Sequence, residues 1–141
     1  MAKHSTASHV KHHLEAHIVW CTKYRYKVLT GKVAERCREL IRQTCVTNGI
    51  EIVKGNIRAD HVHILITYPP RLSVSEIVQK LKGRSSKILQ EEFPEMKKRY
   101  WGRHFWAAGY FVDSISDISE KVISQYIEEQ VDEENDVFKI T

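Results

Sequence analysis

The stretch that decides the fold of this chain reads Asp60-His61-Val62-His63-Ile64-Leu65-Ile66-Thr67, and Tyr68-Pro69-Pro70 follows it. Its short length, its β-branched residues and the double proline predict a buried β-strand rather than a helix. Successive side chains of a strand point to opposite faces, so His61 and His63 are expected to project from the same face. Two imidazoles would then stand side by side on a rigid support.

Paired imidazoles suit a divalent metal ion, because neutral imidazole is a common ligand and the strand backbone fixes the spacing. Two histidines that simply lie on a partly exposed sheet face are the alternative. A histidine-triad nucleotide hydrolase would need another histidine where Leu65 stands. A metallo-β-lactamase would need Asp and His after the pair, and a two-histidine phosphodiesterase would need a second His-x-Ser/Thr motif. The pair must therefore recruit its other ligand from elsewhere.

The composition is that of one globular domain. The chain has 141 residues, of which 42% are hydrophobic and 28% are charged, and these values are typical of a folded core rather than a disordered chain. No apolar run approaches the roughly 20 residues of a membrane helix, and residues 1–11 lack the apolar segment of a signal peptide, so we expect a cytoplasmic protein with no membrane partner. The three cysteines lack Cys-x-x-Cys spacing and are expected to be buried thiols rather than disulfides or zinc ligands.

Charge is divided unevenly along the chain. The net charge is +4, but residues 128–141 hold six acids and one lysine, a net −5, which leaves +9 on residues 1–127. A body this basic indicates a polyanionic partner, with nucleic acid as the first expectation. We interpret residues 1–141 as a single domain, with a flexible arm at 1–11 and an acidic tail at 132–141.

Hydrophobic periodicity and capping signals predict an α+β fold. Strands are expected at 13–22, 50–58, 60–67 and 106–114, with a bulge or turn at Gly55-Asn56. Helices are expected at 31–49, from a capping box at Ser73-Val74-Ser75-Glu76 to an interruption at Gly83, again over 86–93, and from Ser116 or Asp117 to about Val131. This order predicts a ferredoxin-like or RRM-like antiparallel sheet with helices on one face, plus one added C-terminal helix.

Several stretches mix cations with aromatic or hydroxyl side chains, a composition suited to phosphate contact and base stacking. They are residues 23–27, residues 80–87 where a helix would restart, and residues 97–101 and 103–106. A solvated surface is the alternative for each stretch, and some of the aromatic side chains must belong to the core. The candidate DNA-binding residues are Lys23, Arg25, Lys82, Arg84, Ser85, Ser86, Lys87, Arg99 and Arg103.

The expected last helix carries a narrow polar strip within an otherwise apolar face. At about 100° per residue, Tyr126 and Gln130 lie one turn apart on that strip. A tyrosine in such a position is commonly a core residue with its hydroxyl at the edge. Periodicity alone does not distinguish that role from a chemical one.

Together these features resemble the HUH endonuclease superfamily, in which U is a hydrophobic residue, and more closely the single-tyrosine transposases of the insertion sequence 200/605 family. The resemblance extends from about His13 to Gln130. The segments that carry it are Lys23-Tyr24-Arg25, Ala59-Asp60-His61-Val62-His63, Leu81-Lys82-Gly83-Arg84-Ser85-Ser86, Phe105-Trp106, Gly109-Tyr110-Phe111-Val112-Asp113 and Tyr126.

The resemblance implies that Tyr126 is the nucleophile and that His61, His63 and Gln130 bind a divalent ion, Mg²⁺ or Mn²⁺. The implied substrate is single-stranded DNA with hairpins at the ends of a mobile element, cleaved and rejoined through a 5′-phosphotyrosine. It also implies a homodimer in which the tyrosine helix of one subunit can complete the histidine site of the other. The residue types suit this chemistry, because a tyrosine hydroxyl with a pKa of roughly 10 is a poor nucleophile unless a metal draws charge from the phosphate. Asp60 is expected to point away from the metal face, as a turn residue or a support for the ligands.

Other functions fit parts of the sequence. A non-catalytic RRM-like nucleic-acid-binding protein would carry His61 and His63 only as sheet residues and would lack metal-dependent cleavage. A domesticated relative would process repetitive hairpins without mobilising an element, and hairpin ends in the flanking DNA would instead favour an autonomous transposon. A replication-initiator HUH nuclease is not expected, because the sequence shows no helicase or second domain.

Overall fold

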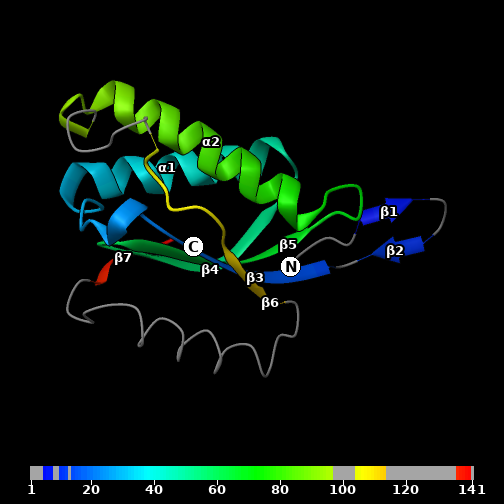
Figure 1. Cartoon of the computed structure of the whole chain (residues 1–141). Helices are drawn as coiled ribbons and strands as arrows, with labels where there is room; N and C mark the ends of the chain where they lie inside the picture. The colour runs from blue at the N-terminus through cyan, green and yellow to red at the C-terminus, as the bar shows by residue number, and fades with distance from the viewer. Residues whose placement is uncertain (1–4, 8–9, 13, 97–103, 114–135, 141) are drawn as a thin grey trace.

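The computed structural model describes residues 5–7, 10–12, 14–96, 104–113 and 136–140. Its main sheet has five antiparallel strands in the order β6-β3-β5-β4-β7, and helices α1 and α2 lie together on one face of it (Figure 1). A separate two-stranded sheet pairs β1 with β2. The elements are β1 (Ser5–Ala7), β2 (Val10–His12), β3 (Leu14–Cys21), the 3-10 turn η1 (Lys23–Arg25), α1 (Gly31–Thr47), β4 (Glu51–Arg58), β5 (His61–Tyr68), α2 (Val74–Glu92), β6 (Phe111–Asp113) and β7 (Asp136–Ile140).

The histidine-bearing strand β5 is the centre of this sheet, between β3 and β4. The predicted α+β class, its antiparallel sheet and its two helices on one face are therefore confirmed. The core lies between the sheet and the helices. Ile18 and Ile64 face each other across β3 and β5 and are fully buried, and Leu40 of α1 and Leu81 of α2 meet the same cluster. Each such burial is worth about 1.5–3 kcal/mol relative to exposure.

Helix α2 begins at the predicted capping box. The Glu76 backbone N–H donates to Ser73 Oγ at 3.0 Å, and the Ser73 backbone N–H donates to Glu76 Oε1 at 2.9 Å. The predicted interruption at Gly83 is wrong, because α2 runs unbroken from Val74 to Glu92. One glycine costs a helix only about 1 kcal/mol, which is less than the burial of Leu81 and Leu89 on the same side of the helix contributes.

Two further details of the strands differ from the predictions. The bulge in β4 lies between Ile52 and Lys54, whereas Gly55-Asn56 sits in regular pairing with β5. The strand expected over 106–114 is reduced to β6, because Gly109 has φ +84° and breaks the extended backbone. Trp106 still makes an isolated bridge with Thr22, so residues 104–113 follow the edge of β3.

Both chain ends include strands that the sequence did not predict. The segment expected as an arm, 1–11, contains β1 and most of β2, which pair with each other, and the segment expected as an acidic tail contains β7, which pairs with β4. The predicted last helix, from Ser116 or Asp117 to Val131, lies outside the described residues. In the described part of the chain, no helix has the length and apolar character to cross a membrane.

The cysteines of the described structure are thiols. Cys37 and Cys45 are buried in α1, and burial raises the pKa of each to about 12. The prediction of buried thiols is confirmed for these two residues, whereas Cys21 at the end of β3 is only partly buried.

Candidate functional site

His61 and His63 share the sheet face that is turned away from α1 and α2. In the register of β3 with β5, Cys21 lies opposite His61 and Val19 lies opposite His63, while the intervening pair of Trp20 and Val62 belongs to the core. Because side chains alternate along a strand, the two imidazoles are on the other face. We call this surface of β3 and β5 the histidine face. The prediction that His61 and His63 project together is confirmed.

The His61 ring is held by a carboxylate. Asp60 lies in the turn before β5, and its Oδ1 is 3.1 Å from His61 Nδ1. The other oxygen, Oδ2, accepts hydrogen bonds from Arg25 at 3.0 and 3.3 Å. The predicted turn position is confirmed, but the carboxylate turns back toward the His61 ring rather than away from it.

This support decides which His61 nitrogen is available. An ionised carboxylate only accepts hydrogen bonds, so His61 donates from Nδ1, and in the neutral ring the lone pair is then on Nε2. His61 Nε2 is buried and has no hydrogen-bond partner among the described residues. A histidine that donates one N–H to a carboxylate and leaves the other nitrogen unprotonated has the arrangement of metal-ligating histidines. The residues present therefore fit a divalent cation.

The Asp60 carboxyl remains ionised over a wide pH range. Its burial would raise its pKa, but the hydrogen bond from His61 and the charge of Arg25 outweigh burial, and the pKa of Asp60 lies below its ordinary value. A carboxyl whose pKa is lowered by folding stabilises the protein above roughly pH 4, and this contribution is lost as the pH falls further.

His17 is the residue on this face that sequence reasoning missed. It is 1% exposed, and its ring stacks on that of His63 with centroids 5.8 Å apart and an angle of 29°. In the sheet register His17 lies opposite Leu65 on one side and Asp113 on the other. The strand predicted over 13–22 includes His17, but only the β3–β5 register brings it beside His63.

The remaining members of the predicted metal site lie outside the described residues. Tyr126 and Gln130 fall in the segment 114–135, so their positions relative to His61 and His63 stay a prediction. Among residues 14–96 and 104–113, no group of three His, Cys, Asp or Glu side chains is arranged to hold a metal ion.

The turn η1 brings a basic and aromatic segment to the end of β3. Tyr24 and Arg25 both have positive φ, 59° and 54°, a conformation that L residues adopt at a cost. Tyr24 is 63% exposed, and Lys23 Nζ lies 5.4 Å from the centre of its ring. This turn therefore presents an aromatic ring and a cation, while Arg25 reaches back to Asp60.

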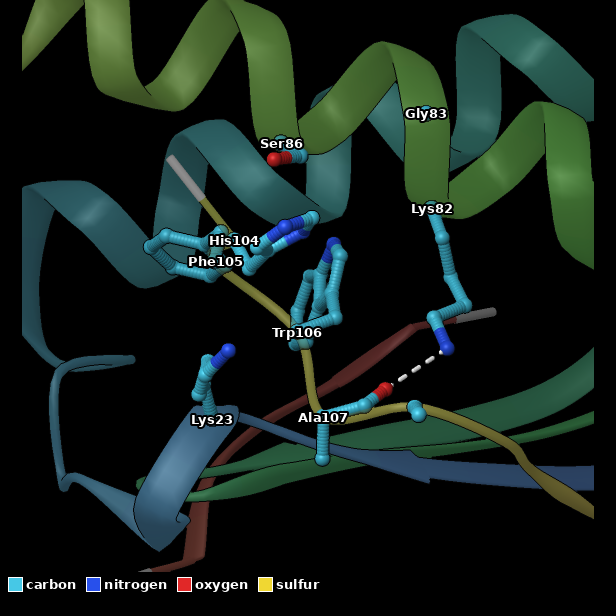
Figure 2. A pocket seen from close by; sticks show the side chains of 9 residues that line it. Lys23, Lys82, Gly83, Ser86, His104, Phe105, Trp106 and Ala107 are labelled. Carbon is cyan, nitrogen blue, oxygen red and sulfur yellow. Dashed lines mark hydrogen bonds between the residues drawn. The ribbon is translucent and has the colours of Figure 1, made fainter. Parts of the chain in front are cut away.

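A pocket of about 430 Å³ opens beside this turn (Figure 2). Lys23, three residues of α2 (Lys82, Gly83 and Ser86) and the segment from His104 to Ala108 line it. Lys82 Nζ donates hydrogen bonds to the carbonyl oxygens of Ala107 and Gly109 at 2.8 and 2.9 Å. Lys82 thus fixes the loop below the pocket while its amino group stays at the pocket wall.

Ser85 is 1% exposed and belongs to the interior. Its Oγ donates to the Leu81 carbonyl at 2.6 Å and accepts from Trp106 Nε1 at 2.9 Å. Phe105 and Trp106 are also buried, so these two aromatic residues belong to the core. The predicted role of Ser85 in contacting DNA is not carried into our proposal, because its hydroxyl anchors Trp106 to α2.

Replacing Trp106 with Phe should lower stability by about 1 kcal/mol, because it removes the N–H that Ser85 accepts within the core. The measurement is urea unfolding of Trp106→Phe, Ser85→Ala and the double variant. If the hydrogen bond is the source, the double variant loses less than the sum of the single variants. If the stability losses of the two single variants add up to that of the double variant, the hydrogen bond is not their source.

The other candidate DNA-binding residues divide into two groups. Arg84 and Lys87 are exposed on α2, and Ser86 is partly exposed. Arg99 and Arg103 lie outside the described residues.

Comparison with known proteins places this chain in a family. The sequence profile described as "Transposase IS200 like" matches residues 10–130, most of the chain. The chain belongs to the IS200-like transposase family. This assignment agrees with the resemblance seen in the sequence.

Relatives of this IS200-like transposase support the assignment. The ISDra2 transposase TnpA of Deinococcus radiodurans is 35% identical over 121 residues, 86% of each chain. The transposase for insertion sequence element IS200 of Salmonella typhimurium is 34% identical over 134 residues, 95% of this chain and 88% of the relative.

Solved structures show the same fold as this IS200-like transposase. A crystal structure of a Deinococcus radiodurans R1 protein described as a transposase superposes with a TM-score of 0.79 at 33% identity, covering 89% of this chain and 97% of that one. A REP-associated tyrosine transposase bound to a REP hairpin superposes with a TM-score of 0.59, covering 89% of this chain and 75% of that one; at 12% identity it shows the fold alone.

Proposed function

We propose that this IS200-like transposase cleaves and rejoins single-stranded DNA at hairpin-bearing ends of its element, using a divalent metal and a covalent 5′-phosphotyrosine. The observation that supports this most is the Asp60–His61 pair, which leaves a buried imidazole nitrogen available beside His63 on the histidine face. A sheet that merely binds nucleic acid has no need for a buried nitrogen supported in this way.

His61, His63 and Gln130 would hold the metal, with Mg²⁺ or Mn²⁺ as the ions that suit phosphate chemistry and Mn²⁺ the more tolerant of imidazole. When bound, the ion would withdraw charge from the scissile phosphate and orient it. Asp60 contributes by fixing the His61 ring, and Arg25 contributes by fixing Asp60.

Tyr126 would supply the nucleophile. Its hydroxyl oxygen bonds to phosphorus as a base takes its proton, the bond from phosphorus to the 3′ oxygen breaks, and a proton is returned to that leaving oxygen. The products are a 5′-phosphotyrosine and a free 3′-hydroxyl. Because the phosphodiester bond is exchanged rather than hydrolysed, a second 3′-hydroxyl can attack the phosphotyrosine and join a new strand without a nucleotide cofactor.

The DNA strand would be bound by cations near the end of β3 and on α2. Lys23, Arg84 and Lys87 are the described candidates for phosphate contact, with Arg99 and Arg103 proposed from the sequence. Tyr24 adds an exposed ring on which a base can stack. Binding through these contacts would weaken as salt concentration rises.

The decisive experiment incubates the protein and Mn²⁺ with single strands taken from the DNA that flanks its gene, labelled at the 3′ end. A denaturing gel should show labelled DNA that migrates with the protein, since tyrosine retains the 3′ fragment. Binding of the same strands without this covalent product would favour a passive RRM-like clamp. Capture of the strands without strand exchange between the two element ends would favour a domesticated hairpin-processing relative.

We propose a homodimer whose subunits exchange the tyrosine helix. Mixing Tyr126→Phe with His63→Ala protein tests this directly, because only an exchanged dimer unites one intact tyrosine with one intact histidine pair. Covalent capture should return to about a quarter to a half of the wild-type level as subunits re-assort. If mixed dimers are shown to form but covalent capture does not return, the tyrosine and the histidine pair of each site belong to the same subunit.

Replacing Asp60 with Ala should weaken Mn²⁺ binding by about 10- to 100-fold, because His61 loses the group that fixes its orientation and its proton. Calorimetric titration of the protein with Mn²⁺ measures this. Asp60→Asn is the matched control, since its side-chain oxygen can still accept a hydrogen bond from His61 Nδ1. Its Mn²⁺ affinity should lie between those of the wild-type protein and Asp60→Ala. Unchanged Mn²⁺ affinity in Asp60→Ala would separate Asp60 from the metal site.

A further inference from the structure

Gly83 stands in the middle of α2, where glycine is a poorer helix former than alanine. Its backbone is not in the left-handed region, and a Cβ built on it would meet no heavy atom within 4 Å among the described residues. Neither backbone geometry nor packing within the described chain therefore calls for glycine. Glycine is also used where a ligand approaches the backbone closely, and a ligand outside the chain would explain Gly83.

Gly83 lines the pocket of Figure 2, and the groups around it favour an anion. Lys82 has two of its three N–H groups bound to the carbonyls of Ala107 and Gly109, which holds the amino group in place. Lys23 adds a second cation, and Ser86 Oγ accepts from Gln90, which leaves its own proton to donate. No carboxylate is present among the described residues that line the pocket.

The charge of Lys82 is costly where it stands. Burial lowers its pKa, an effect that nearby Cys21 only partly offsets. A bound anion would offset the free-energy cost of removing water from the charged amino group of Lys82.

The pocket lies at the end of β3, on the side of the sheet that α2 covers. Trp106 bridges to Thr22, the residue after Cys21, and Cys21 lies opposite His61. Two strand spacings, about 10 Å, therefore separate the segment at Trp106 from the strand that carries His61. The pocket volume of about 430 Å³ is more than a lone phosphate fills and falls in the range of sites for larger ligands.

We propose that this pocket seats a backbone phosphate of the bound DNA strand, with Lys23 and Lys82 as its cations and Gly83 as the gap that admits the strand against α2. This inference rests on the proposed function, since it assumes that the protein binds single-stranded DNA. It adds the place where one phosphate of that strand is held and the reason for a glycine in α2.

The test compares Gly83→Ala and Gly83→Gln with the wild-type protein. Alanine should raise the melting temperature by about 2–4 °C, because it is the better helix former and meets no described atom. The same change should weaken binding of a hairpin-bearing single strand by about fivefold, and Gln should weaken it further by filling the pocket. Stabilisation together with weakened binding is the combined result that a purely structural glycine would not give.

Matched variants distinguish changes in the pocket from the effects of altering α2 or the net charge of the protein elsewhere. Gln79→Ala changes an exposed position on the same helix outside the pocket and should leave DNA affinity unchanged. Lys23→Ala should lower the slope of log affinity against log salt by about 0.7, the value for one lost contact with single-stranded DNA. Lys32→Ala, an exposed lysine of α1, removes the same charge elsewhere and should leave the slope near its wild-type value.

A phosphate scan of the DNA completes the test. One phosphate at a time is replaced with a neutral methylphosphonate. At one position this change should weaken binding by the wild-type protein but should not further weaken binding by Lys23→Ala. A loss spread evenly over all positions, wild-type affinity in Gly83→Ala, or a lower melting temperature in Gly83→Ala would each overturn the proposal. If the wild-type protein failed to bind any single strand, the proposed function itself would fall, and that result is distinct from these three.

Discussion

Replacing Tyr126 with Phe should abolish covalent capture of a cleaved 5′ end, with a loss of about 10⁴-fold or more, the scale seen when a covalent nucleophile is removed. Phenylalanine keeps the ring and its packing but has no oxygen to bond to phosphorus. Affinity for the hairpin-bearing strand should stay within about twofold, because the hydroxyl supplies chemistry rather than phosphate contact. The measurement pairs the denaturing gel with equilibrium binding of the same 3′-labelled strand.

Tyr110→Phe is the matched control for this experiment. Tyr110 is 41% exposed and precedes β6, outside both the histidine face and the pocket. It should retain wild-type capture. Undiminished capture in Tyr126→Phe would remove Tyr126 from the role of nucleophile, and loss in both variants would point to damage that is not specific to the hydroxyl.

Replacing His61 or His63 with Ala should lower Mn²⁺-dependent cleavage by about 10³-fold, because Lewis-acid stabilisation of the phosphate is worth several kcal/mol. Chelation of the metal with EDTA should reduce the wild-type protein to the same level and should have no further effect on either variant. Melting temperatures must be measured in parallel, because His61 is fully buried.

A residual rate that still responds to Mn²⁺ in both histidine variants would remove the pair from the metal site. His63→Gln gives a finer comparison, since an amide oxygen can ligate Mn²⁺ in place of imidazole. It should need a higher Mn²⁺ concentration for half-maximal cleavage than the wild-type protein. His63→Ala should not recover at any concentration that the protein tolerates.

Local rules were enough for the features that depend on neighbours in the sequence. The alternation around His61 and His63 predicted their shared face, and the spacing of Ser73 and Glu76 predicted the start of α2. Both follow from the geometry of a single element. The resemblance to a family added the identity that local rules could not supply.

Features that depend on pairing between distant segments were missed. His17 comes beside His63 only through the register of β3 with β5, which the sequence of either strand does not state. The helix was expected to break at Gly83 because the helix penalty of glycine was considered without the burial of Leu89, which comes after Gly83 in the chain. Lys82 was predicted as a candidate for DNA contact, and that role stays a prediction; the sequence did not show that the carbonyl oxygens of Ala107 and Gly109 hold its amino group.

The Asp60 carboxylate contacts both Arg25 and His61, and this changes the role expected for Arg25. Arg25 was a candidate for phosphate contact, but its guanidinium is already neutralised by Asp60, which also supports His61. An alanine scan of the basic residues would therefore record a large defect at Arg25 even if that side chain never met the substrate. The loss at Arg25 should appear in the turnover rate, whereas a loss at Lys87 should appear in the affinity.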